Sequence, residues 1–403
     1  MVMLWQKTII FAMIRRDSLK FYQKKPTEFT STDMKPALNI YHILSDKQWS
    51  GPEQYAYDLI AQIKDDGNKY YTEVVTQNRP KIIEHFRSLE VPVSILPLKS
   101  LSDLDSSLRL ARQIKRGNNI LHVHNMKDAA TAVLACHISE NPNNRVVLTS
   151  HSVEKPKTSF WYRRILRDID HIIFSSRISY NEFIDHAKRF DRSRASVIND
   201  SIRPMLNYAE TYDLRRTCEI DADKALILFH GRVCKEKGVD VLLRAITQLD
   251  KSTYHLAIIG DGDKRFVKRL RSFIEANQLE HNITMLGYQP NLQELLVQAD
   301  FGVLPAAWRE PFGISNLEYM MLGKAHIATN NGGQVEYLQN EKNALLVNPS
   351  DFSELAAAIK RLIDDPALRH NIGAQAQADF NSRLSYEHFY SQIIDLYTGL
   401  YTK

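Results

Sequence analysis

The chain has few cysteines and no long apolar stretch. Three cysteines occur among its 403 residues, Cys136, Cys218 and Cys234, and they lie far apart. Because they show no paired spacing, they predict neither a zinc motif nor a disulfide framework, which is typical of a reducing cytoplasm. The sequence has no run of about eighteen apolar residues, so we expect no membrane-spanning helix.

Charge and composition argue against nucleic-acid-binding, disordered and fibrous proteins. The net charge is +5, with 52 Lys and Arg against 47 Asp and Glu, which is too mild to predict nucleic-acid binding. Apolar residues make up 44% and charged residues 25% of the chain, and these values argue against disordered and fibrous classes. A chain of this length can bury two cores, so we expect two domains.

The N-terminal residues differ from the rest of the chain. Residues 1–12 form a short apolar run that Gln6 and Lys7 interrupt, and basic residues follow it. A signal peptide needs a longer apolar segment and a small-residue cleavage site. We therefore expect residues 1–36 to be an extension, and folded structure to begin near Met34.

From residue 37 onward, short apolar segments alternate with amphipathic helical patterns. In the first half we expect strands at 37–44, 71–75, 91–96, 120–124, 145–149, 171–175 and 195–198. In the second half we expect strands at 225–230, 254–259, 283–286, 301–304, 326–329 and 344–347, and closing helices at 352–363 and 386–400. This alternation predicts an α/β fold built from parallel, doubly wound sheets.

The same pattern suggests where the domains lie. We expect one Rossmann-like domain at 37–203 and a second at 222–380, joined by a linker at 204–221. Residues 381–403 are expected to form a C-terminal helix that crosses back to the first domain.

Two carboxylates, Glu310 and Glu318, lie eight residues apart around the turn Pro311-Phe312-Gly313. The turn follows an expected strand and leads into a short helical pattern. Backbone N–H groups at such a helix start favour an anion such as a diphosphate, and a carboxylate in the loop can accept hydrogen bonds from ligand hydroxyls. Ser315 and Glu318 also match a capping box. The pattern leaves both roles open.

The expected strand at 225–230 is followed by a second candidate loop. Gly231 permits a tight turn, and Arg232 and Lys237 place two cations beside the next helix start. An Arg fork and a Lys point charge together can hold a diphosphate. A solvated basic loop is the alternative.

The first half offers weaker candidates. Gly51 lies in an expected loop where backbone can approach a ligand, and His151 follows a strand end, where such sheets bind ligands. His122 and His124 share one face, but no third ligand is spaced nearby, so we expect packing rather than metal binding. Asp261 and Asp263 resemble a carboxylate pair, for which a helix-capping turn is the simpler explanation.

Residues 155–164 mix basic and aromatic side chains: Lys155, Lys157, Phe160, Trp161, Tyr162, Arg163 and Arg164. Such a helix can lie on an anionic membrane surface. A solvated helix face explains the pattern equally well.

A series of motifs in the second half resembles the donor domain of glycosyltransferase family 4. It comprises Gly231-Arg232 with Lys237-Gly238, Gly260-Asp261-Gly262, Leu286-Gly287, Glu310 through Glu318, Gly323-Lys324, Gly332-Gly333 with Glu336, and Leu346-Val347. The resemblance is dense over 222–380 and loose over 37–203. It implies the GT-B architecture, with two Rossmann-like domains facing across a cleft.

The resemblance also implies a function: retaining transfer of a sugar from a nucleotide diphosphate sugar. Glu310 would hold the sugar hydroxyls with the backbone of Phe312, Gly313 and Ile314. Beside them, Glu318 would hold the ribose and Tyr288 would lie near the base. Arg232 and Lys237 would stabilise the departing diphosphate, so that no metal or other cofactor is needed. From the first domain, Gly51 and His151 would complete the site.

The acceptor is less well defined, because the first domain departs from the family pattern at Ser50-Gly51 and Trp49. A glycan or a lipid-linked acceptor in polysaccharide assembly, met at the inner face of a membrane, fits the basic aromatic segment. A sugar-nucleotide epimerase and a catalytically silent binding protein remain as alternative functions.

Overall fold

The structure is a computed structural model that describes residues 38–402, except for residues 48, 68, 101–102, 205–212 and 290. The described residues belong to one compact unit. The extension expected at 1–36, the start near Met34 and residues 205–212 of the expected linker lie outside the described residues.

The first half forms a seven-stranded sheet in which every pairing is parallel, in the order β3-β2-β1-β4-β5-β6-β7. Its strands are β1 (Asn39–Leu44), β2 (Tyr71–Thr76), β3 (Val93–Ile95), β4 (Asn119–Val123), β5 (Asn144–Ser150), β6 (His171–Phe174) and β7 (Ala195–Val197). The helices are α2 (Gly51–Asp65), α3 (Pro80–Ser88), α4 (Leu104–Gln113), α5 (Met126–Ser139), α6 (Phe160–Asp168) and α7 (Arg177–Ile184), with the 3-10 turn η1 (Arg192–Arg194).

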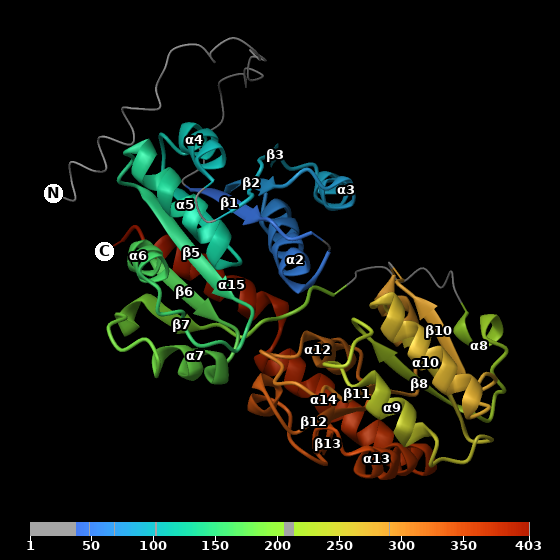
Figure 1. Ribbon diagram of the computed structural model, residues 1–403. Coiled ribbons are helices and arrows are strands. Elements are labelled where there is room, and N and C mark those ends of the chain that lie inside the picture. The colour runs from blue at the N-terminus through green and yellow to red at the C-terminus, as the bar shows by residue number, and fades with distance from the viewer. Residues whose placement is uncertain are drawn as a thin grey trace. The chain divides into compact units, whose positions relative to one another are not determined.

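The second half forms a six-stranded parallel sheet in the order β10-β9-β8-β11-β12-β13. Its strands are β8 (Ala225–His230), β9 (Tyr254–Ile259), β10 (Ile283–Gly287), β11 (Phe301–Leu304), β12 (His326–Thr329) and β13 (Leu345–Val347). The helices are α8 (Leu214–Thr217), α9 (Val239–Ile246), α10 (Lys264–Ala276), α11 (Leu292–Leu296), α12 (Ile314–Met321), α13 (Phe352–Asp364), α14 (Pro366–Arg383) and α15 (Tyr386–Gly399), with η2 (Gly333–Glu336). The expectation of two parallel sheets is confirmed (Figure 1).

Each sheet is buried on both faces, which explains why its strands read as apolar runs. One face of the first sheet packs against α4, α5, α6 and α7, and the other against α2 and α15. One face of the second sheet packs against α9, α10 and α13, and the other contributes to clusters with α8, α11, α12 and α14. Figure 1 shows α15, in red, beside β5 and β6 of the first sheet although it closes the chain.

Both sheets contain a point where the strand order reverses. It lies between β1 and β4 in the first sheet and between β8 and β11 in the second. The connections after these strands leave to opposite sides, so the carboxyl ends of the strands border a crevice in which doubly wound sheets bind ligands. The loops after β8 and β11 carry Lys237 and Glu310.

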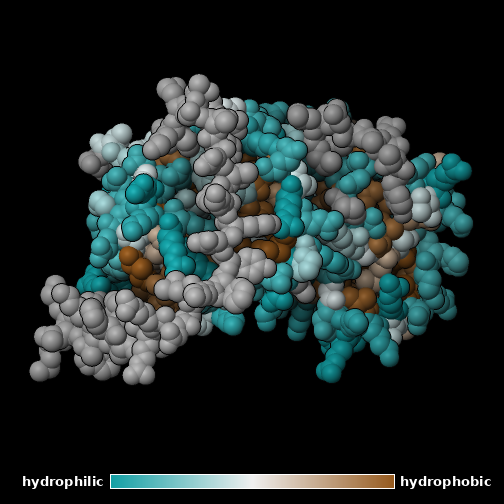
Figure 2. Space-filling model, turned by 90° about the horizontal axis from the view of Figure 1, so that it is seen from above, coloured by the Kyte–Doolittle hydropathy of each residue, from teal (hydrophilic) through white to brown (hydrophobic). Residues whose placement is uncertain are grey.

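On the face drawn in Figure 2, hydrophilic residues cover most of the described surface. Among the described residues, none of the helices combines the length and the apolar character that crossing a membrane requires.

Candidate active site

The centre of the candidate site is an ion pair between the two candidate loops of the second sheet. Lys237 follows β8 and Glu310 follows β11, and Lys237 Nζ donates to Glu310 Oε1 over 2.6 Å. Glu310 is only 6% exposed. A carboxylate buried to this extent needs a partner, so the pair satisfies Glu310 structurally and also places a cation at the switch point. The sequence pattern suggested a ligand role for Glu310 and did not indicate this partner.

A small cavity opens beside this pair. Its polar lining comes from Lys237, Glu310, Gly313, Ser315, Asn316 and Gln334, and its apolar lining from Phe229, Leu304 and Ala306. The helix α12 begins at this cavity, because Gly313 is its N-cap with φ of +89°. The cavity therefore combines a cation with the N–H groups of a helix start, which is the environment that an anionic group favours.

The capping box expected at Ser315 and Glu318 is wrong. Gly313 rather than Ser315 caps α12, and no side chain caps this helix start. The left-handed backbone at Gly313 starts the helix two residues earlier than the Ser-x-x-Glu pattern suggests. Ser315 therefore lies in the first turn beside the cavity, and Glu318 is left without a capping role.

Glu318 has a different partner, which the sequence did not indicate. Its carboxylate is hydrogen-bonded to His230 Nε2, and His230 Nδ1 lies 3.2 Å from the Tyr319 hydroxyl. Tyr319 in turn donates to the carbonyl of Leu228 over 2.8 Å. His230 is the last residue of β8, so its position at a strand end was the signal that could have identified it. The chain of bonds fixes the orientation of Glu318.

Residues in and next to η2 form hydrogen bonds with the backbone of the loop that contains Glu310. Gly333 N donates to the Glu310 carbonyl over 2.7 Å, and the Tyr337 hydroxyl lies 2.9 Å from the carbonyls of both Phe312 and Gly313. Phe312 itself is buried, with 1% exposure, so only its backbone can face a ligand. The site loop is thus fixed by backbone contacts that require the folded sheet.

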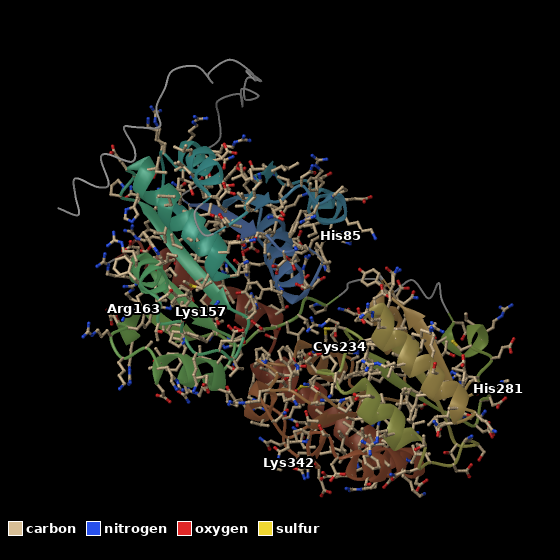
Figure 3. All side chains as sticks on the ribbon, in the orientation of Figure 1. His85, Lys157, Arg163, Cys234, His281 and Lys342 are labelled. Atoms are coloured by element: carbon tan, nitrogen blue, oxygen red, sulfur yellow. The ribbon has the colours of Figure 1, made fainter. Side chains whose placement is uncertain are left out.

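The loop after β8 is fixed by glycine contacts. A Cβ on Gly260 would lie 1.9 Å from the Gly231 carbonyl, and a Cβ on Gly238 would lie 1.9 Å from the Pro305 carbonyl. Gly231 and Gly238 both have positive φ, +128° and +70°. Arg232 lies exposed on this loop, which Cys234 marks in Figure 3. The close approach of backbone explains the glycine spacing that the sequence shows.

The remaining candidates lie in less enclosed positions. Tyr288 is 55% exposed in the loop after β10. Ile314 is the first residue of α12 and half-buried. Gly51 is exposed as the first residue of α2, so its expected position in a loop is corrected: Ser50 caps that helix with Glu53. Within the described residues, no hydrogen bond or ion pair joins Gly51 or His151 to the Lys237–Glu310 pair.

His151 belongs to a histidine cluster on the first sheet. Its Nε2 lies 3.1 Å from His124 Nδ1, and burial lowers its pKa to about 4, so its imidazole is neutral at pH 7. His122 and His124 meet His42 of β1, and one ring nitrogen from each lies within 4.8 Å of the others. The expectation that no third ligand lies nearby is therefore wrong, because the third histidine comes from a neighbouring strand.

The Asp261-Gly262-Asp263 turn caps a helix, which was the simpler of the two roles considered for it. Asp263 is the N-cap of α10, and its side chain accepts hydrogen bonds from the N–H groups of Arg265 and Phe266. The three cysteines are free, as expected.

Comparison with known families identifies the family of the chain. Residues 49–204 match the family model described as "Glycosyltransferase Family 4", and residues 212–379 match the model described as "Glycosyl transferases group 1". The chain belongs to glycosyltransferase family 4. Between the two matched ranges lie residues 205–211.

Curated proteins resemble parts of the chain. An uncharacterized glycosyltransferase of Methanocaldococcus jannaschii is 29% identical over 212 residues, which is 51% of this chain and 54% of that protein. The lipopolysaccharide core biosynthesis glycosyltransferase LpsD of Rhizobium meliloti is 31% identical over 183 residues, 45% of this chain and 52% of LpsD. The chain thus spans about half the length of these curated relatives.

Solved structures show the fold of this family 4 member. The Anabaena protein Alr3699/HepE, in complex with UDP and glucose, superposes with a TM-score of 0.78 at 20% identity, covering 89% of this chain and 99% of HepE. Sucrose-phosphate synthase from Thermosynechococcus elongatus gives a TM-score of 0.71 at 21% identity, covering 90% and 99%. The expected GT-B fold is confirmed.

Proposed function

We propose that the protein is a glycosyltransferase that moves a hexosyl group from a nucleotide diphosphate sugar to a glycan or lipid-linked acceptor. A UDP-sugar is the favoured donor and a GDP-sugar the alternative. The observation that carries the proposal is the Lys237–Glu310 pair beside the N-terminus of α12, at the switch point of the second sheet. The names of HepE, solved with UDP-glucose, and of LpsD support the donor and a role in polysaccharide or lipopolysaccharide assembly.

The proposed reaction retains the configuration of the sugar. The bond between the anomeric carbon and the β-phosphate oxygen breaks, while the acceptor oxygen bonds to the same face of that carbon. The acceptor proton passes to the departing diphosphate oxygen. Arg232 and Lys237 offset the negative charge that builds on that oxygen, a task that a metal ion performs elsewhere, so we propose that transfer needs no metal.

The other site residues hold the donor in place. Glu310 can accept hydrogen bonds from sugar hydroxyls with its second carboxylate oxygen while the first stays bound to Lys237. The diphosphate lies at the start of α12, over Gly313, Ile314 and Ser315. Glu318, fixed by His230, binds the ribose, and the exposed Tyr288 stacks on the base. His151 and Gly51 face the sugar from the first domain.

A ligand screen tests the proposal directly. The melting temperature of the protein is measured with UDP-, GDP- and ADP-sugars, because a ligand that binds only the folded state stabilises it, by about 2.7 kcal/mol at one hundred times its Kd. We expect a UDP-sugar to raise the melting temperature, and EDTA to leave that rise unchanged. Release of UDP with and without acceptor then separates transfer from epimerisation. The proposal fails if no nucleotide sugar binds.

Stereochemistry is tested on the product. The anomeric proton of the transferred sugar is read by NMR, and the same anomeric configuration as in the donor is expected. An inverted product would contradict the retaining mechanism and leave sugar transfer intact.

The lipid-linked acceptor rests on the exposed start of α6. Phe160 and Trp161 are 68% and 71% exposed there, and Figure 3 labels Lys157 and Arg163 in the same region. Exposed aromatic rings beside cations suit an anionic membrane interface. Vesicles containing phosphatidylglycerol should bind the protein, and Trp161→Ala should weaken binding several-fold. Equal binding to neutral vesicles would contradict an anionic interface, and no binding to either kind of vesicle would argue for a soluble acceptor.

A further inference from the structure

The histidine cluster of the first sheet combines residues from two neighbouring strands. His42 of β1 and His122 of β4 are partners in the parallel register, with ring centroids 5.2 Å apart. His124 follows two residues later, so in extended chain it points to the same face. All three are buried, at 0%, 0% and 5% exposure. The cluster lies at the switch point of the first sheet, where ligands bind in such folds.

Several nitrogens of the cluster have no partner. Within the described residues, neither Nδ1 nor Nε2 of His42 accepts or donates a hydrogen bond, and the same holds for His124 Nε2. Leaving a buried polar group unsatisfied destabilises the folded state. Two adjacent imidazoles with unpartnered nitrogens that face a third therefore need an explanation beyond core packing.

We infer that His42, His122 and His124 form a binding site for a divalent transition metal, with Zn²⁺ as the preferred ion. Three imidazoles without a carboxylate suit Zn²⁺, Co²⁺ or Ni²⁺, whereas Mg²⁺ and Ca²⁺ require oxygen ligands. Three histidines and one open position form a known tetrahedral arrangement. Burial holds the pKa of all three imidazoles below the usual value, which keeps them in the neutral form that ligates metals.

Metal binding requires the rings to rotate, because His124 stacks on His122 with an interplanar angle of 27° and on His42 with one of 18°. Stacked imidazoles do not aim their ring nitrogens at one point. The three candidate nitrogens lie within 4.8 Å of one another, and Zn–N bonds of about 2.0–2.1 Å need them somewhat closer. His122 must also release one of its two hydrogen bonds, which join Nδ1 with the Tyr397 hydroxyl and Nε2 with Thr149 Oγ1. The unpartnered nitrogens of His42 and His124 gain a ligand bond without such an exchange.

The metal would also determine the protonation pattern of His151. When His124 Nε2 binds the ion, its proton must lie on Nδ1, which is 3.1 Å from His151 Nε2. His124 then donates, His151 Nε2 accepts, and the remaining His151 nitrogen carries the proton. Ligating histidines are commonly oriented by such outer partners. This consequence rests on the proposed function, which places His151 beside the sugar; the metal site itself does not.

Cobalt titration tests the site in the full chain, produced without a histidine tag. The protein is stripped with a chelator, and CoCl₂ is added while the visible spectrum is recorded, since four-coordinate Co²⁺ absorbs far more strongly than hydrated Co²⁺. We expect one Co²⁺ per chain, displacement by ZnCl₂, and a higher melting temperature. A spectrum of hydrated Co²⁺ at all ratios would overturn the inference.

Variants assign the ligands. His42→Gln and His124→Gln should each weaken binding at least tenfold, whereas His85→Gln and His281→Gln, at two exposed histidines labelled in Figure 3, should not change it. Binding that only the exposed variants abolish would contradict the site. A UDP-sugar melting shift in the metal-free wild type tests the proposed function separately, because it reports on the second sheet.

Discussion

At the residue scale, the two cations of the loop after β8 differ in their surroundings. Arg232 is exposed, whereas Lys237 pairs with the buried Glu310. Arg232→Ala should lower kcat about 10²–10³-fold with little change in stability. Lys237→Ala should lower kcat similarly and also cost about 1–3 kcal/mol of stability, because Glu310 loses its partner. Sugar-transfer assays and urea unfolding measure both effects.

The control for these variants comes from the same loop. Lys235 is exposed and lies outside the ion pair, so Lys235→Ala should keep both kcat and stability near the wild-type values. An equal loss of activity in Lys235→Ala would show that Arg232 and Lys237 act only through the overall positive charge of the loop.

Asp200 should make stability depend on pH. Its side chain is buried, one carboxylate oxygen has no partner among the described residues, and burial raises its pKa from 3.8 to about 7. The folded state therefore holds the proton more tightly than the unfolded state, so this group stabilises the protein below pH 4 and the contribution is lost as pH rises through 7. Asp200→Asn should raise the free energy of unfolding at pH 8 by roughly 2–4 kcal/mol. Urea unfolding at pH 5 and pH 8 measures the difference, and an equal effect at both values would contradict it.

The site was predicted from the types of residue that follow the ends of expected strands. Lys237 and Glu310 follow apolar strands that the sequence marks clearly, so their meeting at one sheet edge was predictable. The direct bonds of Lys237 to Glu310 and of His230 to Glu318 were not predictable, because each depends on side-chain geometry between residues 73 and 88 positions apart in sequence. His42, the third histidine of the cluster, was not predicted for the same reason. It lies 80 positions from His122 in sequence and is adjacent to it only in the sheet.

At the element scale, two glycines near the expected site differ in what surrounds them. Gly260→Ala should displace the loop of Gly231 and Arg232, because the new Cβ would lie 1.9 Å from the Gly231 carbonyl and φ is +130°. We expect a loss of about 1–3 kcal/mol in stability and a higher KM for the donor. Gly51→Ala meets no atom within 4 Å, and should leave the free energy of unfolding unchanged. Thermal unfolding and donor KM distinguish the two variants.

Elements with broad apolar stripes were predictable, and those that pack through small residues were not. The strands and the helices at 352–363 and 386–400 were expected close to their observed bounds. The eighteen-residue α14 between them was not expected. Its buried positions are Ile372, Gly373, Ala376 and Phe380, and a Cβ on Gly373 would lie 2.2 Å from the Gly323 carbonyl. Close backbone packing of this kind leaves no large hydrophobic periodicity in the sequence.

At the scale of the whole molecule, the last two helices, α14 and α15, pack against different sheets. Ala376, Phe380 and Leu384 pack in a cluster with α12 of the second sheet. Tyr386, Phe389, Ile393 and Tyr397 pack in a cluster with α2 and the strands of the first sheet. The first sheet therefore depends on residues that the chain supplies last.

This dependence predicts where a C-terminal variant acts. Ile393 is fully buried, so Ile393→Ala should cost about 2–4 kcal/mol, whereas the exposed Glu387→Ala should stay within about 0.5 kcal/mol of the wild type. Hydrogen exchange locates the loss: amides of β1, β4 and β5 should exchange faster, while those of β8 and β9 keep their protection. Faster exchange confined to β8 and β9 would show that α15 stabilises the second sheet instead, since local opening follows the contacts that a variant removes.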